Sequence, residues 1–274
     1  MTTSLLSRSS ESATPIAPLS WRIVWDRNRE GAENMAIDQA LADEHAPGSG
    51  VLRFYGWTRP TVSFGRNEPV QGVYDLGRAK ALGFDVVRRP TGGRAVFHHR
   101  ELTYTVVAPH KAFGGVRGAY RSINAALEAG LSSLGASVAQ APEGTPTLGP
   151  DAGACFAHPA AGELTAGARK LVGSAQARVG SAFLQHGSIL IQADQYRLDE
   201  VRLAPSGEGG QPPAGLAELV RNVRPRDVAN AVAEAMRSAF GGDWKDGALS
   251  ESEKEIAGKL ELERYRRVEW TMRR

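Results

Sequence analysis

Two adjacent glycines, Gly92 and Gly93, are flanked by side chains that can donate hydrogen bonds. Paired glycines let the backbone adopt a positive φ and approach a ligand closely, because no Cβ atom intervenes. The flanking donors are Arg89, Arg94, His98 and His99. The segment matches neither the phosphate-loop pattern nor the glycine pattern of dinucleotide-binding folds. It predicts a bare turn between two strands that forms one wall of a ligand pocket, with a plain hairpin as the alternative.

Lysine is rare in this chain, which has six lysines against 27 arginines. One of them, Lys170, precedes the small residues Gly173, Ser174 and Ala175. Small neighbours leave room for an ammonium group to lie against a closely held partner. Alone, Lys170 would be interpreted as a solvated strand lysine, but together with the glycine turn it allows a functional interpretation.

Cys155 is the only cysteine, so no intrachain disulfide can form and a zinc cluster of cysteine and histidine ligands is not expected. A lone cysteine is either a small buried side chain or a reactive thiol. The thiolate is the nucleophile, and an ordinary thiol with a pKa of about 8.5 supplies only a few per cent of it at neutral pH. A nearby cation would raise that fraction. The candidates, in order, are Lys170, His158 and the His98–His99 pair.

Hydrophobic periodicity predicts mixed strands and helices without regular βαβ alternation, which indicates an α+β fold. The expected strands are 21–25, 51–55, 61–64, 84–87, 95–97 and 102–108, with several more between 163 and 191. Gly180-Ser181 is expected as a turn, and His186-Gly187-Ser188 as a break between strands. The expected helices are 31–44, 75–82, 120–134, 225–240 and 251–264.

The whole chain of 274 residues suits one domain over 21–274 that ends in a short helical tail. Residues 1–20 are rich in Ser, Thr, Pro and Ala and are expected to be a disordered leader rather than a signal peptide. No apolar run approaches the ~18 residues of a membrane span. The net charge of +3 is mild and the arginines are dispersed, so nucleic-acid binding is not indicated. We expect a cytoplasmic protein with no membrane partner.

Four motifs together resemble the lipoate ligase and octanoyltransferase superfamily. They are the segments from Arg88 to Tyr104, from Arg169 to Gln176, from Leu184 to Leu190 and from Glu33 to Asp38. The resemblance extends from about Trp21 to Trp270. It implies the biotin/lipoate ligase catalytic fold, in which a mixed, largely antiparallel sheet is packed by helices.

The position of Cys155, after a long helix and shortly before Lys170, resembles the LipM-type octanoyltransferases. That resemblance implies Cys155 as covalent nucleophile and Lys170 as its electrostatic partner. It implies transfer of octanoyl from acyl carrier protein to a lysine of a lipoyl-domain protein such as the glycine cleavage H protein, without a cofactor. The substrate-binding residues expected at the site are Arg89, Thr91, Gly92, Gly93, Arg94, His98, Gly173, Ser174, Ala175, His186 and Gly187.

The segment after Cys155-Phe156 departs from the LipM-type pattern, because it lacks the usual aromatic residue and carries His158. Other functions within the superfamily stay open. The chain could be a lipoate–protein ligase that needs ATP and magnesium, or an amidotransferase that moves octanoyl between lipoyl domains. A binding protein without catalysis would keep the fold but acquire no acyl group. A biotin ligase is disfavoured, because the glycine-rich loop of those enzymes is not present.

Overall fold

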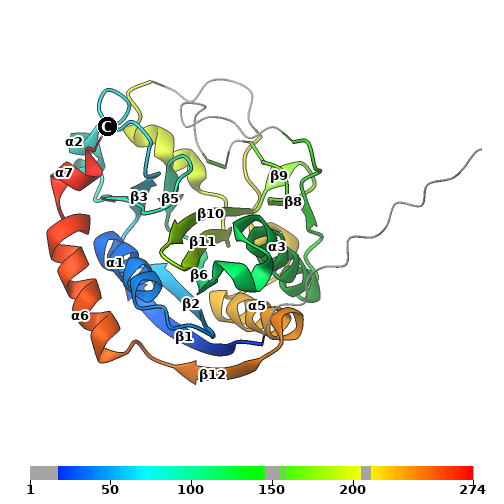
Figure 1. Cartoon of the computed structure of the whole chain (residues 1–274). Coiled ribbons are helices and arrows are strands. Elements are labelled where there is room, and N and C mark those ends of the chain that lie inside the picture. Colours follow the sequence, from blue (N-terminus) through cyan, green and yellow to red (C-terminus); the bar gives the residue numbers. More distant parts are fainter. Residues whose placement is uncertain (1–17, 146–154, 157, 205–210, 274) are drawn as a thin grey trace, which may run out of the picture.

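The computed structural model describes residues 18–145, 155–156, 158–204 and 211–273. Most of the expected leader therefore lies outside the described residues, and its last residue, Ser20, begins the first strand. The fold is centred on a six-stranded sheet with helices on both faces (Figure 1). Among the described residues, no helix is long and apolar enough to cross a membrane.

The main sheet has the strand order β10-β11-β6-β2-β1-β12. The pairs β10–β11, β11–β6 and β6–β2 are antiparallel, whereas β1 pairs in parallel with both β2 and β12. The bounds are β1 Ser20–Arg29, β2 Ser49–Trp57, β6 Glu101–Pro109, β10 Val172–Val179, β11 Ala182–Leu190 and β12 Asp243–Gly247. The predicted α+β fold with a mixed, largely antiparallel sheet is confirmed.

Alternate residues of the strands face two separate cores. In β2, Leu52 and Phe54 pack toward α3 and α5, while Val51 and Tyr55 pack toward α1 and α6. These helices are α1 Gly31–Asp43, α3 Val116–Ser133, α5 Pro225–Phe240 and α6 Glu251–Leu260. Gly130 lets α3 approach α5 closely, since a Cβ there would lie 2.9 Å from the Ala231 carbonyl oxygen.

A second sheet, of order β4-β3-β5, carries the glycine segment. Its strands are β3 Thr61–Phe64, β4 Asp85–Arg88 and β5 Val96–His98, and α2 Leu76–Ala81 precedes β4. Because β4 and β5 both pair with β3, residues 89–95 cross the end of β3 and do not form a hairpin. The prediction of two strands meeting at a glycine turn is corrected accordingly. We call residues 89–95 the glycine loop.

The third sheet is small and has the order β7-β8-β9. It comprises β7 Ala139–Gln140, β8 Leu164–Ala166 and β9 Arg169–Lys170. The sharp turn from β8 to β9 contains Gly167, whose φ is +61°. This turn brings Lys170 back antiparallel to Thr165, so that the lysine points inward.

The break predicted at His186-Gly187-Ser188 is wrong, because all three residues continue β11. Gly187 is needed there for packing and not for a turn. A Cβ on it would lie 2.7 Å from Cε1 of Tyr104 and 2.8 Å from the Gly173 carbonyl oxygen. The glycine therefore lets β11 pass under neighbouring side chains while the strand stays continuous.

The remaining elements are short. They are the 3₁₀ turns His110–Phe113 and Gln195–Val201, α4 Leu216–Leu219 and α7 Val268–Thr271. The helix predicted over 251–264 begins at a capping box of Ser250 and Glu253, but α6 ends at Leu260 and a π-helical turn continues to Tyr265.

Candidate active site

A cavity of about 1040 Å³ lies between the glycine loop, strands β10 and β11, helix α3 and the segment around Cys155. Of the residues expected at the site, those that line the cavity are Cys155, Lys170, Arg89, Gly92, Gly93, Arg94, His98, Gly173, Ser174, Ala175, His186 and Gly187. Thr91 is fully buried behind the lining and bonds to His186. The structure thus brings together residues from three motifs that are far apart in the sequence.

Lys170 lies beside the only thiol. Its Nζ is 3.5 Å from Cys155 Sγ and donates a hydrogen bond of 3.0 Å to the Cys155 carbonyl oxygen. The same ammonium forms an ion pair of 2.7 Å with Glu163. The Lys170 side chain is only 1% exposed, so the carboxylate is what makes a buried cation tolerable. The thiol therefore faces a fixed positive charge.

Phe156 anchors the cysteine from its other side. It packs with Val96 and Leu190, and the Cys155 amide donates to the Ala95 carbonyl oxygen at 3.2 Å. A Cβ at Gly173 would lie 2.8 Å from Cζ of Phe156 and 3.3 Å from Cε of Lys170. The glycine of the Lys170 motif thus makes room for both neighbours of the thiol.

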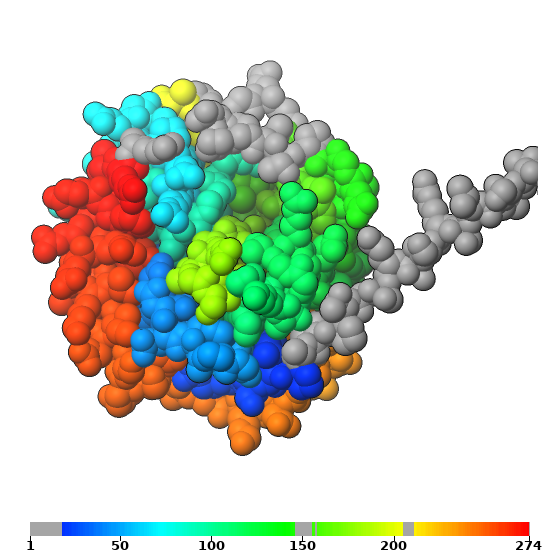
Figure 2. All heavy atoms as spheres, viewed as in Figure 1, coloured from blue at the N-terminus to red at the C-terminus, as the bar shows by residue number. Residues whose placement is uncertain are grey.

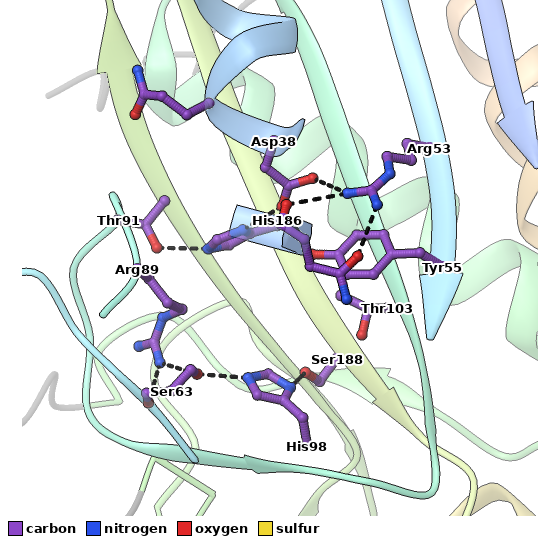
Figure 3. Close-up of polar contacts among 12 residues, drawn as sticks. Asp38, Arg53, Tyr55, Ser63, Arg89, Thr91, His98, Thr103, His186 and Ser188 are labelled. Atoms are coloured by element: carbon purple, nitrogen blue, oxygen red, sulfur yellow. Dashed lines mark hydrogen bonds and ion pairs between the residues drawn. The ribbon is translucent and has the colours of Figure 1, made fainter. Parts of the chain in front are cut away.

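Arg89 holds the glycine loop from behind, and Figure 3 shows its contact with Ser63. Its guanidinium donates to the carbonyl oxygens of Ser63 at 2.6 Å, Gly92 at 3.1 Å and Arg94 at 2.9 Å. These carbonyls are thereby turned into the protein, while Gly92 and Gly93 line the cavity. These contacts of the Arg89 guanidinium with backbone carbonyls fix the shape of the loop.

His186 connects the glycine loop to the main sheet and α1 (Figure 3). Burial lowers the pKa of His186, so the ring is neutral at neutral pH. Burial alone would raise the pKa of Asp38, but bonds from His186 and the charge of Arg53 bring it below its ordinary value. The Asp38 carboxylate can only accept, so His186 Nδ1 donates to it at 2.9 Å. The Thr91 hydroxyl then donates to Nε2 at 2.6 Å.

His98 is held in the same manner. Its Nδ1 lies 2.8 Å from Glu101 and its Nε2 lies 2.6 Å from the Ser63 hydroxyl. Burial alone would raise the pKa of Glu101, but His98 and hydroxyl donors hold it below its ordinary value. Both ring nitrogens of His98 are occupied by these partners, and in the described part of the chain neither bonds to Cys155. His99 turns away to bond with Asp194.

His158, the second candidate cation, lines the cavity. Within the described part of the chain it forms no hydrogen bond with Cys155, whereas Lys170 does. The first candidate from the sequence is therefore the one that the structure places at the sulfur.

The sequence interpretation missed two residues of the site. Trp57, which is not among the expected site residues, lines the cavity and stacks on His98 with ring centroids 4.0 Å apart. Glu163 was given no role, yet it neutralises Lys170. A lysine that is buried at a site needs a carboxylate to compensate its charge. Glu163 stands seven residues before Lys170, so this need could have identified it from the sequence.

Comparison with known proteins gives a consistent result. Residues 30–238 match the family model described as the lipoyl protein ligase A/B catalytic domain. The chain is 39% identical to Octanoyltransferase LipM of Symbiobacterium thermophilum and 38% identical to Octanoyltransferase LipM of Carboxydothermus hydrogenoformans. Each alignment covers 93% of this chain and 99% of the relative.

Solved structures share the fold at lower identity. A structure from a study of an archaeal lipoylation system, a bipartite lipoate protein ligase and its E2 lipoyl domain from Thermoplasma acidophilum, aligns with a TM-score of 0.76 and 23% identity, over 93% of this chain and 96% of that one. Lipoate-protein ligase A bound with ATP aligns with a TM-score of 0.77 and 23% identity, over 93% and 99% of the two chains.

Proposed function

Because the chain belongs to the family of lipoyl protein ligase A/B catalytic domains, we propose that it is an octanoyltransferase of lipoate biosynthesis that works through a thioester on Cys155. Relatives that carry the name octanoyltransferase align along nearly their full length and support this activity. One structural observation carries the mechanism. Cys155 Sγ lies in the cavity, 3.5 Å from the Lys170 ammonium.

In the first half-reaction, the Cys155 thiolate attacks the carbonyl carbon of an octanoyl thioester. A carbon–sulfur bond forms, and the carbonyl electrons move to oxygen, giving a tetrahedral oxyanion. The positive charge of Lys170 stabilises the thiolate beforehand and the oxyanion afterwards. When the oxyanion collapses, the bond to the carrier sulfur breaks. The carrier leaves as a thiol after taking up the proton that Cys155 had lost.

In the second half-reaction, a neutral ε-amine of an acceptor lysine attacks the Cys155 thioester. An amide bond forms, the carbon–sulfur bond of the acyl-enzyme breaks, and the amine gives up one proton as the Cys155 thiol is restored. The atoms balance without ATP, because the thioester already supplies the activated acyl group. No cofactor is therefore part of the proposal.

The cavity suits an acyl chain at its inner end. The buried lining residues there include Met35, Tyr55 and Trp57, which offer apolar surface. Each buried CH₂ contributes roughly 0.8 kcal/mol, so the methylenes of an octanoyl chain contribute about 5 kcal/mol before entropic losses. That gain is large enough for the enzyme to select chain length.

The proposed donor is octanoyl-acyl carrier protein, and the proposed acceptor is a lipoyl-domain protein such as the glycine cleavage H protein. The fold relative from Thermoplasma acidophilum, described together with its E2 lipoyl domain, supports an acceptor of the lipoyl-domain class. The mild positive net charge of +3 is compatible with an acidic carrier protein.

The test is intact-mass spectrometry after mixing the protein with octanoyl-acyl carrier protein in the absence of ATP. We expect an added octanoyl mass that hydroxylamine removes, and no adduct on the Cys155→Ala variant. Retained acyl transfer by Cys155→Ala would refute the thioester mechanism. Acceptor modification that requires free acid, ATP and magnesium would instead identify a ligase. Transfer only from an octanoylated lipoyl domain would identify an amidotransferase.

A further inference from the structure

The exposed part of the cavity lining carries two arginines from one helix. Arg117 and Arg121 stand four residues apart on α3, and both are exposed while lining the cavity. Residues at this spacing are neighbours on a helix surface, with Cβ atoms about 6 Å apart. The α3 surface borders the hollow visible on this face of the molecule (Figure 2).

Contacts one turn away fix this helix face against the catalytic segment. Asn124 donates to the Gly162 carbonyl oxygen at 2.8 Å. Tyr120 lies 3.7 Å from the position that a Cβ on Gly162 would take, and Gly162 adjoins Glu163, the partner of Lys170. The two arginines are therefore held beside the same cavity as the thiol.

The cations that line the cavity differ in what they bind. Arg89 is engaged by backbone carbonyls and Lys170 by Glu163, as described above. In the described ranges, by contrast, neither Arg117 nor Arg121 has a hydrogen bond or an ion pair, not even with Glu143, which is exposed on the same lining. Two uncompensated guanidinium groups at the entrance of a cavity attract an anion.

The cavity is large enough to hold more of the donor than its acyl chain. Its 1040 Å³ reaches the upper end of the range of roughly 300–1,000 Å³ for small-ligand sites. An octanoyl group occupies only the buried end. The outer part has room for the arm that presents the thioester, and in a carrier protein that arm carries one phosphodiester between the protein and the reactive sulfur.

We propose that Arg117 and Arg121 bind the phosphodiester of the donor's phosphopantetheine arm while its thioester lies at Cys155. This inference rests on the proposed function. Guanidinium groups suit the site because each can offer two parallel N–H donors to phosphate oxygens. The arginines therefore set donor preference, and they take no part in bond making.

The contribution of the phosphate is separated from that of the carrier protein by comparing three donors: octanoyl-pantetheine, octanoyl-4′-phosphopantetheine and octanoyl-acyl carrier protein. Single-turnover octanoylation of Cys155 is followed by mass spectrometry for the wild type, Arg117→Met, Arg121→Met and the double variant. We expect the preference for octanoyl-4′-phosphopantetheine over octanoyl-pantetheine to fall roughly 10-fold per arginine removed. Arg226→Met, an exposed arginine on α5 outside the cavity lining, serves as the matched control.

An unchanged ratio between the two small donors in the double variant would overturn the inference. A loss seen only with the intact carrier protein would also overturn it, because the arginines would then meet the carrier's own acidic surface. If the wild type accepted octanoyl from none of the three donors, the proposed function itself would fail. These outcomes are distinguishable in one set of experiments.

Discussion

Lys170 makes three contacts that no mobile surface lysine could maintain together. Its ammonium touches the carbonyl oxygen and the sulfur of Cys155 and the carboxylate of Glu163. The carboxylate fixes the direction of the side chain, and this direction places the charge at the sulfur. Glu163 is thus a positioning residue that acts on the thiol through Lys170.

Glu163→Gln is expected to slow octanoylation of Cys155 by about 100-fold, because a displacement of about 1 Å in a reacting group has an effect of that size. The amide keeps the shape but removes the negative charge that holds the ammonium. Single-turnover acylation and the rate of Cys155 alkylation by iodoacetamide would both fall. Glu255→Gln removes an exposed ion pair with Lys259 on α6 and should change neither rate.

Partial recovery in Glu163→Asp would support the positioning role, since the charge returns on a shorter arm. A Glu163→Gln variant that acylates at the wild-type rate would show that Lys170 needs no fixed partner.

At the residue scale, the sequence predicted which residues line the cavity better than it predicted the contacts that each of them makes. Twelve of the expected residues line one cavity, because the motifs that carry the family resemblance contain them. Arg89 and His186, which were expected to bind substrate, both line the cavity and also bond to protein groups, namely Ser63, Thr91, Asp38 and loop carbonyls. Hydrogen bonds between residues 95 or 148 positions apart leave no trace in a local pattern.

At the scale of elements, the glycine loop depends on a glycine outside its own motif. A Cβ on Gly65 would lie 1.7 Å from the Gly93 carbonyl oxygen, which is a backbone atom and cannot rotate away. Gly93 itself has a φ of +91°. The end of β3 and the loop that crosses it are therefore in direct backbone contact.

Gly65→Ala is expected to lower the free energy of unfolding by about 1–3 kcal/mol, because the loop or β3 must shift to make room. Urea denaturation measures this change. Gly258→Ala is the control, since no atom lies within 4 Å of the added Cβ and an alanine favours helix α6. Equal stability of Gly65→Ala and the wild type would mean that the contact relaxes freely.

Element prediction succeeded at a long amphipathic helix and at a short apolar strand bounded by turn residues. The helix expected at 225–240 matches α5, and the strand expected at 61–64 matches β3. It failed at His186-Gly187-Ser188, where local turn chemistry suggested a break and tertiary packing against Tyr104 required a glycine. The pairing of β4 and β5 with β3 was also invisible, because strand order is set by long-range contacts.

At the scale of the whole molecule, Arg88 ties the last described helix to the base of the site. Its buried guanidinium donates to the carbonyl oxygens of Trp270, Thr271, Gly65 and Glu68, and Trp270 Nε1 donates back to the Arg88 carbonyl oxygen. Figure 1 shows α7 beside the second sheet. Arg88, the residue just before the glycine loop, therefore links segments that are about 180 positions apart in the chain.

Arg88→Met is expected to release α7, because several buried carbonyls lose their donor at a cost of about 1–3 kcal/mol each. Hydrogen–deuterium exchange should show faster exchange at 268–271, together with a lower unfolding midpoint. Arg66→Met, an exposed neighbour of the glycine loop, should leave both unchanged. Unchanged protection of α7 in Arg88→Met would show that packing of Trp270 alone holds the helix.

The parallel pairing of β12 with β1 has a consequence for synthesis on the ribosome. Ser20 is matched with Asp243, so one side of β1 has no strand partner until the chain has grown to that point. At 5–20 residues per second, the wait is roughly 10–45 s. The strand that starts the chain's main sheet thus waits through most of translation for its second partner, and the sheet reaches its full width only near the end of synthesis.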